Sequence, residues 1–243
     1  MKERFWDNVA SDYDAEICNT LRSDRNRRLE SVVREHATGA SIACDFGCGV
    51  GRFLPLLLDC GPTIIATDFS AVSLEIARQS LSETQLRRVD LQKQDLTVGR
   101  PRIAKPNKAD LALLINVIIM PDREHRRNIL ANVRRNMVSG GTLIVATPSL
   151  ESALYSHTRM IEWSERDGSS YKKAVAAEDA SAKKEIRSLT SGILDIEDTA
   201  TKHYLGEELA VELNRAGFEC CKRHRIEFEW TEEFQSPPRW LRD

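Results

Sequence analysis

The chain has 243 residues, 41% of them hydrophobic, which is enough to build the core of one domain of ordinary size. Its net charge is −2 and 30% of its residues are charged, so it has neither the strong positive field of a nucleic-acid binder nor an acidic tail. The longest apolar run, from Leu111 to Met120, is shorter than the roughly 20 residues that span a bilayer, and the first residues lack the apolar stretch of a signal peptide. We therefore expect a soluble, cytoplasmic protein that binds neither nucleic acid nor a membrane.

The cysteines predict no metal site. None of the six forms a C-x-x-C pair, and no histidine cluster stands at the spacing of zinc ligands. Because free cysteine is among the most buried residue types, we expect reduced thiols packed as small hydrophobic groups, with a redox or metal role as the less favoured alternative.

Residues 1–40 are expected to form a helical cap. Their first helical pattern places Tyr13 on an apolar face. A second amphipathic helix is expected from Asp24 onward, with Leu29 and Val33 facing inward.

The clearest motif follows this cap. A short apolar run ends in Asp45, and Gly47, Gly49 and Gly51 come next at every second position, directly before a helical pattern. Glycine allows a positive φ and leaves no Cβ between the backbone and a ligand, while a helix N-terminus favours an anionic group. We expect a strand, a tight turn and a helix that bind a nucleotide-like ligand. A dinucleotide fingerprint would need glycine where Arg52 stands.

An acidic residue ends the next predicted strand. The β-branched run 63–67 leads into Asp68, Phe69 and Ser70, and Asp68 lies 68 − 49 = 19 positions after Gly49. In a parallel sheet this spacing places Asp68 beside the glycine turn, where its carboxylate can accept both hydroxyls of a ribose. Phe69 is suited to stack on a purine, and Ser70 to cap the next helix. The alternative is that Asp68 only caps that helix.

Two further strands complete the predicted sheet. A strand begins at Val89, and residues 109–120 are almost continuously apolar, as in a central strand buried on both faces, with Asn116 as the polar interruption. A helix and another strand, residues 142–147, follow. This alternation predicts an α/β fold, a doubly wound and mostly parallel sheet with helices on both faces.

The D-x-G-x-G-x-G form at Asp45 to Gly51 resembles motif I of the class I (Rossmann-like) S-adenosylmethionine-dependent methyltransferases, and the match to the order of that family covers residues 41–149. The resemblance implies S-adenosylmethionine as the cofactor. It implies that Asp68 binds the ribose, that Asp95 accepts the adenine amino group and that the backbone N–H of Leu96 donates to the ring. It also implies cofactor-binding roles for other residues of these motifs: Tyr13 and Asn116 by the methionine part, and Asp45, Gly47, Gly49, Phe69 and Ser70.

The remaining residues depart from a minimal fold of this kind. Residues 150–204 are expected to form a helical insertion after the fifth strand that lies over the cleft as a lid. We expect a C-terminal helix and strand in residues 205–243, the strand running from Glu219 to Trp230. Whether the family's seventh strand is present stays open. The chain is thus predicted to be a single domain in four parts: 1–40, 41–149, 150–204 and 205–243.

The predicted chemistry is methyl transfer to the O, N or C atom of a small organic acceptor by in-line displacement. No N-P-P-Y or D-P-P-Y sequence follows the fourth strand and no Pro-Cys pair occurs, which disfavours nucleic-acid methylation. If the acceptor needs a general base, the residues to consider are His157, His203 and Tyr204. Two alternatives are a nicotinamide-dependent oxidoreductase and a catalytically silent S-adenosylmethionine-binding protein. The oligomeric state is not predicted.

Overall fold

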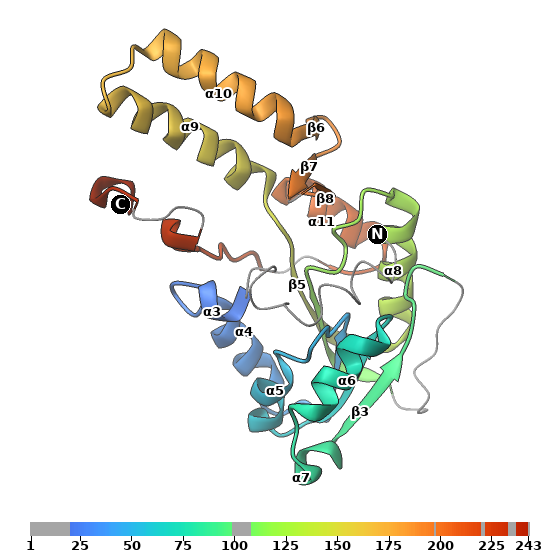
Figure 1. Ribbon diagram of the computed structural model, residues 1–243. Coiled ribbons are helices and arrows are strands. Elements are labelled where there is room, and N and C mark those ends of the chain that lie inside the picture. The colour runs from blue at the N-terminus through green and yellow to red at the C-terminus, as the bar shows by residue number, and fades with distance from the viewer. Residues whose placement is uncertain (1–19, 99–107, 197, 220–221, 233–236, 243) are drawn as a thin grey trace.

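The computed structural model describes residues 20–98, 108–196, 198–219, 222–232 and 237–242 (Figure 1). Its centre is a five-stranded sheet in the order β3-β2-β1-β4-β5, in which every pairing is parallel. The order reverses between β1 and β4, so that ligands of such a sheet bind beyond the carboxyl ends of these two strands. The doubly wound α/β fold is confirmed. The strands are β1 (Ile42–Phe46), β2 (Thr63–Asp68), β3 (Val89–Lys93), β4 (Ala109–Ile115) and β5 (Met137–Ala146).

Helices cover both faces of this sheet because its central strands are apolar on both sides. One hydrophobic cluster joins Ala43 of β1 to Val33 and Leu57, and a second joins the next residue, Cys44, to Val133. The neighbouring positions of a strand point to opposite faces, so these clusters are the two halves of the core. The first face carries α4 (Arg28–Ala37), α5 (Leu54–Cys60) and α6 (Ala71–Gln79), and the second carries α8 (Arg123–Arg135) and α11 (Gly206–Arg215). Two short helices, α3 (Thr20–Ser23) and α7 (Glu83–Leu86), complete this part.

Local sequence signals set several of the helix starts. The hydroxyl of Ser70 accepts a hydrogen bond of 3.1 Å from the backbone N–H of Ser73, which confirms that Ser70 caps α6. Pro55 stands in the first turn of α5, where its missing N–H costs nothing. Asp122 caps α8 in the same way as Ser70 caps α6.

The insertion consists of a helical hairpin and a small sheet. The helices α9 (Leu150–Arg166) and α10 (Tyr171–Glu185) extend away from the main sheet at the top of Figure 1. They were predicted as helical. The antiparallel sheet that follows, in the order β6-β7-β8, was not predicted, because strands of three or four residues are too short to show an alternating pattern. Its strands are β6 (Ile186–Ser188), β7 (Ile193–Ile196) and β8 (Thr199–Lys202).

The predicted C-terminal strand is wrong. Within the described residues after α11, the only pairing is an isolated bridge between Phe228 and Asp24, followed by the 3-10 helices η1 (Trp230–Glu232) and η2 (Arg239–Arg242). Residues 222–225 are exposed and charged, so they present no apolar face that would dock them on the sheet edge. In the described part of the chain, no helix has the length and apolar character needed to cross a bilayer.

Candidate functional site

The glycine turn, residues 47–51, joins β1 to α5 in the conformation that its glycines predict. Gly47, Gly49 and Gly51 have φ values of 70°, 52° and 83°. The N–H groups of Gly47 and Cys48 both donate to the carbonyl of Thr67, at 2.7 and 3.0 Å. The turn is therefore fastened to the carboxyl end of β2.

The turn also needs glycine because neighbouring groups come close to it. A Cβ on Gly47 would lie 2.5 Å from Cγ2 of Val117, which belongs to the loop after β4. A Cβ on Gly51 would lie 2.8 Å from Leu54 and 3.0 Å from Ala77. The turn is thus packed between the start of α5, α6 and the loop after β4.

Asp68 lies beside the glycine turn, as predicted. Its Oδ2 accepts a hydrogen bond of 2.9 Å from the N–H of Gly49, and its Oδ1 accepts one of 2.9 Å from the N–H of Ser70. The residue is 8% exposed. An ionised carboxylate has about four acceptor positions, so it can hold the turn and also accept the hydroxyls of a sugar. The half-buried Phe69 follows at the same edge.

Asp45 is a buried carboxyl group next to this site. It is 2% exposed, and within the described residues its Oδ2 has no hydrogen-bond partner. Burial, and after it the negative charge of Asp68, raises the pKa of the Asp45 carboxyl to about 7. A buried oxygen without a donor fits a ligand that brings a donor or a positive charge.

Asp95 follows β3, the neighbour of β2, at the same edge of the sheet. Its Oδ1 accepts hydrogen bonds from the N–H and hydroxyl of Thr97, at 2.8 and 2.6 Å, and the residue is exposed. Leu96 is buried, and its carbonyl accepts a hydrogen bond of 2.7 Å from the side chain of Asn132. The turn after β3 is therefore fixed to α8.

Asn116 comes directly after β4, at the point where the strand order reverses. Its φ of 56° is left-handed, a conformation that asparagine tolerates better than most residues. Its N–H donates to the carbonyl of Ala146 at 2.9 Å, and its Nδ2 donates to Oγ1 of Thr20 at 3.0 Å. The structure thus brings Asp45, Asp68, Asn116 and the glycine turn together. Tyr13 lies outside the described residues.

The three residues considered as bases lie in two places. His157 is on α9, with Nδ1 at 2.7 Å from Glu178 of α10, so it joins the two helices of the hairpin. His203 and Tyr204 follow β8 and lie beside the main sheet, because the N–H of Tyr204 donates to the carbonyl of Pro148, just after β5, at 2.9 Å.

His203 and Tyr204 are both buried. Nδ1 of His203 lies 3.2 Å from the carbonyl of Thr201, and burial lowers the pKa of its imidazole. The hydroxyl of Tyr204 donates to the carbonyl of Ile118 at 2.9 Å, and burial raises the pKa of that hydroxyl. The role of a general base stays a prediction for all three residues.

Two buried cations near this edge were not predicted. Arg126 is 8% exposed, and Lys202 is 1% exposed with its Nζ 2.7 Å from Oε2 of Glu208. Arg126 carries a signal in the sequence, because it precedes Ile129 and Leu130 by three and four positions and so shares the buried face of α8. Nothing in the local sequence marks Lys202.

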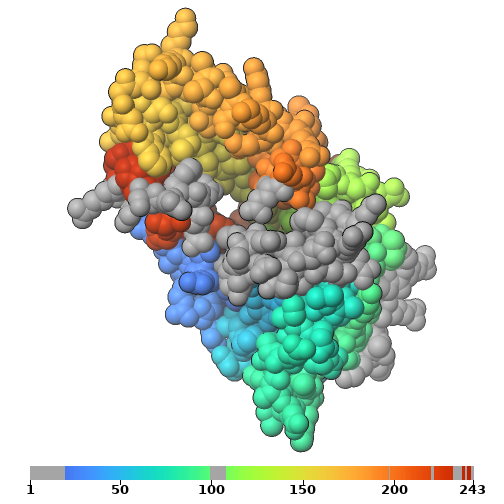
Figure 2. Space-filling model, in the orientation of Figure 1, coloured from blue at the N-terminus to red at the C-terminus, as the bar shows by residue number. Residues whose placement is uncertain are grey.

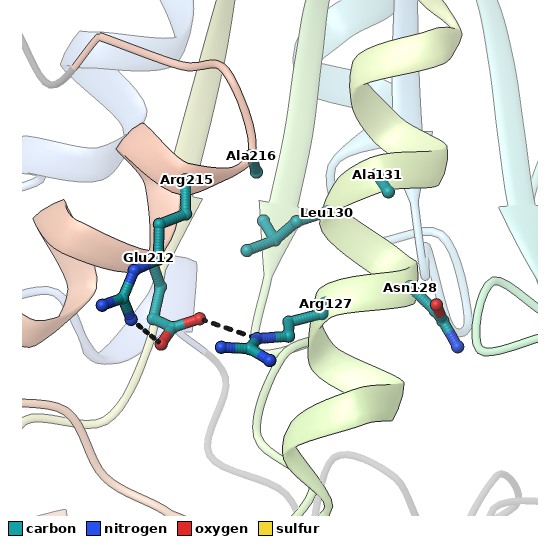
Figure 3. A pocket seen from close by; sticks show the side chains of 7 residues that line it. All are labelled: Arg127, Asn128, Leu130, Ala131, Glu212, Arg215 and Ala216. Carbon is teal, nitrogen blue, oxygen red and sulfur yellow. Dashed lines mark hydrogen bonds and ion pairs between the residues drawn. The ribbon is translucent and has the colours of Figure 1, made fainter.

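A separate groove lies between α8 and α11 (Figure 3). In it the carboxylate of Glu212 faces Arg215 at 3.3 Å and Arg127 at 3.8 Å. The groove contains none of the predicted site residues. It is lined by Arg127, Asn128, Leu130, Ala131, Glu212, Arg215 and Ala216.

Comparison with known proteins agrees with this geometry. Residues 43–141, from β1 into β5, match the family model described as a methyltransferase domain. Over these residues the chain is similar to methyltransferase domains, and its sheet has the strand order of the class I, S-adenosylmethionine-dependent methyltransferase fold. S-adenosylmethionine is the cofactor of this class, and the residues present fit it: an acid beside a bare glycine turn suits its ribose, and the unpartnered oxygen of Asp45 suits its cationic part.

Solved structures share the fold over most of their length. DhpI in complex with SAH (S-adenosylhomocysteine) is 15% identical, with 90% of this chain and 87% of that chain covered and a TM-score of 0.58. Magnesium protoporphyrin IX methyltransferase (ChlM) from Synechocystis PCC 6803, with bound SAH, is 14% identical, with 93% and 91% covered and a TM-score of 0.58. No curated protein matches the sequence.

Proposed function

We propose that this methyltransferase domain transfers the methyl group of S-adenosylmethionine to a small organic acceptor by in-line displacement. The observation that carries the proposal is the meeting of the glycine turn, Asp68 and Asn116 at the switch point of the sheet, with the insertion joined to the same edge. In Figure 2 the residues of the insertion (yellow to orange) form the upper part of the face, and residues of the cofactor-binding core (light blue to green) lie in the lower part.

The residues at the edge have separate roles in this proposal. Asp68 accepts the ribose hydroxyls, and Asp95 and Leu96 hold the adenine, against which Phe69 stacks. Asp45 and Asn116, with Tyr13, lie by the methionine part. The cofactor supplies a methyl group already activated on its sulfonium, so the chain mainly has to orient the acceptor and exclude water, which in ideal cases contributes on the order of 7–11 kcal/mol.

A small acceptor is favoured by the charge and by the insertion. The net charge of −2 gives little attraction for a phosphate backbone. The insertion is joined to the carboxyl edge by the backbone hydrogen bond from Tyr204 to Pro148, and in this proposal it covers the acceptor there. ChlM, which shares the fold over 93% of this chain, is by its name a methyltransferase of a small molecule. The cytoplasmic location expected from the sequence remains part of this proposal.

Calorimetric titration with S-adenosylhomocysteine tests the cofactor site. Loss of two charge-assisted hydrogen bonds predicts that Asp68→Ala weakens binding roughly 100-fold. The 2′-deoxy form of the same ligand tests whether the lost affinity comes from the ribose. Wild-type protein should bind this form more weakly than S-adenosylhomocysteine, whereas Asp68→Ala should bind the two ligands equally well. Asp179→Asn, an exposed aspartate on α10, is the matched control and should bind as wild type does. Equal affinity of wild type and Asp68→Ala would remove the basis of the proposal.

A transfer assay tests the acceptor class. Purified protein and labelled S-adenosylmethionine are incubated with a panel of small hydroxyl, amine and activated-carbon acceptors, and in parallel with RNA, DNA and protein. We expect label to appear in one small-molecule class. Transfer only to the macromolecules would refute the small acceptor while leaving the cofactor site intact.

A further inference from the structure

The loop after β4, residues 116–121 (the β4 loop), is held by groups that come from the end of the insertion. The hydroxyl of Tyr204 donates to the carbonyl of Ile118 at 2.9 Å. The backbone N–H of Lys202 donates to the carbonyl of Ile119 at 2.6 Å. The insertion is therefore bonded to two consecutive peptide groups of this loop.

The same loop is held from its other end by α8. One guanidinium nitrogen of Arg126, Nη1, donates to the carbonyls of Met120 and Pro121, at 2.7 and 2.6 Å. Four consecutive carbonyl groups of the β4 loop thus accept hydrogen bonds from outside the loop. These hydrogen bonds fix the backbone of the loop, because a displaced carbonyl would lose its donor, and the loss costs most at the buried Ile118.

Tyr204 is the best placed of these groups to hold a single conformation. Its side chain is 3% exposed. The ammonium group of Lys202 lies 4.6 Å from the centre of its ring, and the guanidinium of Arg126 lies 6.0 Å from it. The ammonium is in turn 2.7 Å from Glu208 and 2.9 Å from the carbonyl of Ser191. Cation–π contacts with Lys202 and Arg126 therefore help to hold the Tyr204 ring in the position from which its hydroxyl donates to Ile118.

The β4 loop touches the cofactor turn directly. Val117 occupies the space that a Cβ on Gly47 would fill, with its Cγ2 at 2.5 Å from that position. Asn116, at the start of the loop, directly follows β4 at the point where the strand order reverses. A shift of the Ile118 carbonyl would move the adjacent Val117 against the glycine turn.

We propose that Tyr204 is a positioning residue, which sets the β4 loop and through it the glycine turn for cofactor binding. This inference rests on the proposed function, because it takes the glycine turn to be the cofactor site. It gives the Tyr204 hydroxyl a role as a hydrogen-bond donor to the chain itself, and makes the end of the insertion a part of the cofactor site rather than only a cover for the acceptor.

The test compares Tyr204→Phe with Tyr171→Phe. The second substitution removes the same hydroxyl from a side chain that is 65% exposed at the start of α10. Loss of one buried hydrogen bond predicts about fivefold weaker binding of S-adenosylhomocysteine to Tyr204→Phe by calorimetry. It also predicts faster amide hydrogen exchange in peptides covering residues 116–121 but not in those covering β2. Tyr171→Phe should change neither quantity.

A merely structural Tyr204 would give a different result. It would lower the melting temperature without changing affinity or loop exchange at a temperature well below melting. Arg126→Lys is the second variant, because lysine keeps the charge but its shorter side chain does not carry a nitrogen as far as Nη1, and we expect the same two changes. If wild type binds the ligand and both variants bind equally well, the inference is wrong and the proposed function stands. If wild type itself fails to bind, both fall.

Discussion

Two loops meet at the carboxyl edge of the sheet, and they are held in different ways. The backbone conformation of the glycine turn comes from its own residues and from the neighbouring strand β2. Gly47 and Gly51 have positive φ values, the N–H of Gly51 donates to the carbonyl of Cys48, and the carbonyl of Thr67 accepts from the start of the turn. The β4 loop takes its shape from side chains far along the chain. Tyr204 is 86 positions from the carbonyl group that it holds.

This difference separates the glycine turn, a motif that can serve many chains, from the β4 loop, whose conformation depends on contacts particular to this protein. A turn encoded in consecutive residues works in any chain that supplies the two flanking strands. A loop held by Tyr204, Lys202 and Arg126 depends on the insertion and on α8, so changes in the insertion alter the site without touching the glycine motif.

The largest effect is expected at the contact between the loops. Gly47→Ala places a methyl group 2.5 Å from Val117 and puts alanine at a φ of 70°. Overpacking costs about 1–3 kcal/mol and a left-handed alanine about 1–2 kcal/mol, so we expect the free energy of unfolding to fall by about 2–5 kcal/mol in urea titrations.

Gly140→Ala is the matched control for that substitution. Gly140 has a φ of 79° and nothing within 4 Å of its Cβ position, so alanine there carries the backbone cost alone. Adding Val117→Ala to Gly47→Ala should recover the overpacking part and leave a loss similar to that of Gly140→Ala. Equal losses for Gly47→Ala and Gly140→Ala would mean that the two loops do not press on each other.

The same contrast explains what could be predicted from the sequence. The glycine turn, the position of Asp68 and the cap at Ser70 follow from signals within a few residues, combined with the rule that parallel strands end at one edge. Arg126 was missed although its place on the apolar face of α8 is readable, because an arginine there is usually taken as a solvent-exposed residue.

Other features had no local signal. The strands β6 to β8 are too short for a period-two pattern. The hydrogen bond that joins His157 to Glu178 depends on how α9 meets α10, which spacing along one helix does not specify. The reverse error occurred at residues 219–230, which were expected to form a strand, whereas the described residues among them make only an isolated bridge at Phe228. Long-range packing decided each of these outcomes.

The next largest effect is expected from Asp45, the buried carboxyl group that precedes the glycine turn. Burial and the charge of Asp68 raise the pKa of Asp45 to about 7, against 3.8 for an unperturbed carboxyl. Between about pH 4 and pH 7 the folded protein then holds a proton that the unfolded chain has lost. The contribution of Asp45 to stability therefore falls as pH rises through this window, by at most about 1.4 kcal/mol per pH unit, and is constant outside it.

Asp45→Asn isolates this contribution, because it removes the titrating group and leaves the others in place. In urea titrations without cofactor at several pH values, we expect the stability of wild type minus that of Asp45→Asn to decline from about pH 4 to pH 7 and then level off. A constant difference would show that Asp45 keeps an ordinary pKa and that its charge is solvated or paired.

The smallest effect measures how much of the β4 loop is encoded by its own residues. Asn116 holds a φ of 56° and donates to Thr20. Asn116→Ala loses the tolerance for left-handed backbone and the hydrogen bond to Thr20. The free energy of unfolding should fall by about 1 kcal/mol, which lowers the melting temperature by roughly 2–4 °C for a domain of this size. Asn116→Asp keeps the tolerance for left-handed backbone and an oxygen that can accept from the Thr20 hydroxyl, so it should melt close to wild type.

If Asn116→Ala instead lowers the melting temperature more than Tyr204→Phe does, the loop is specified mainly by its first residue, and the contrast between the two loops is one of degree. If it costs nothing, the loop is held entirely by the remote side chains, and the insertion alone decides the geometry on this side of the site.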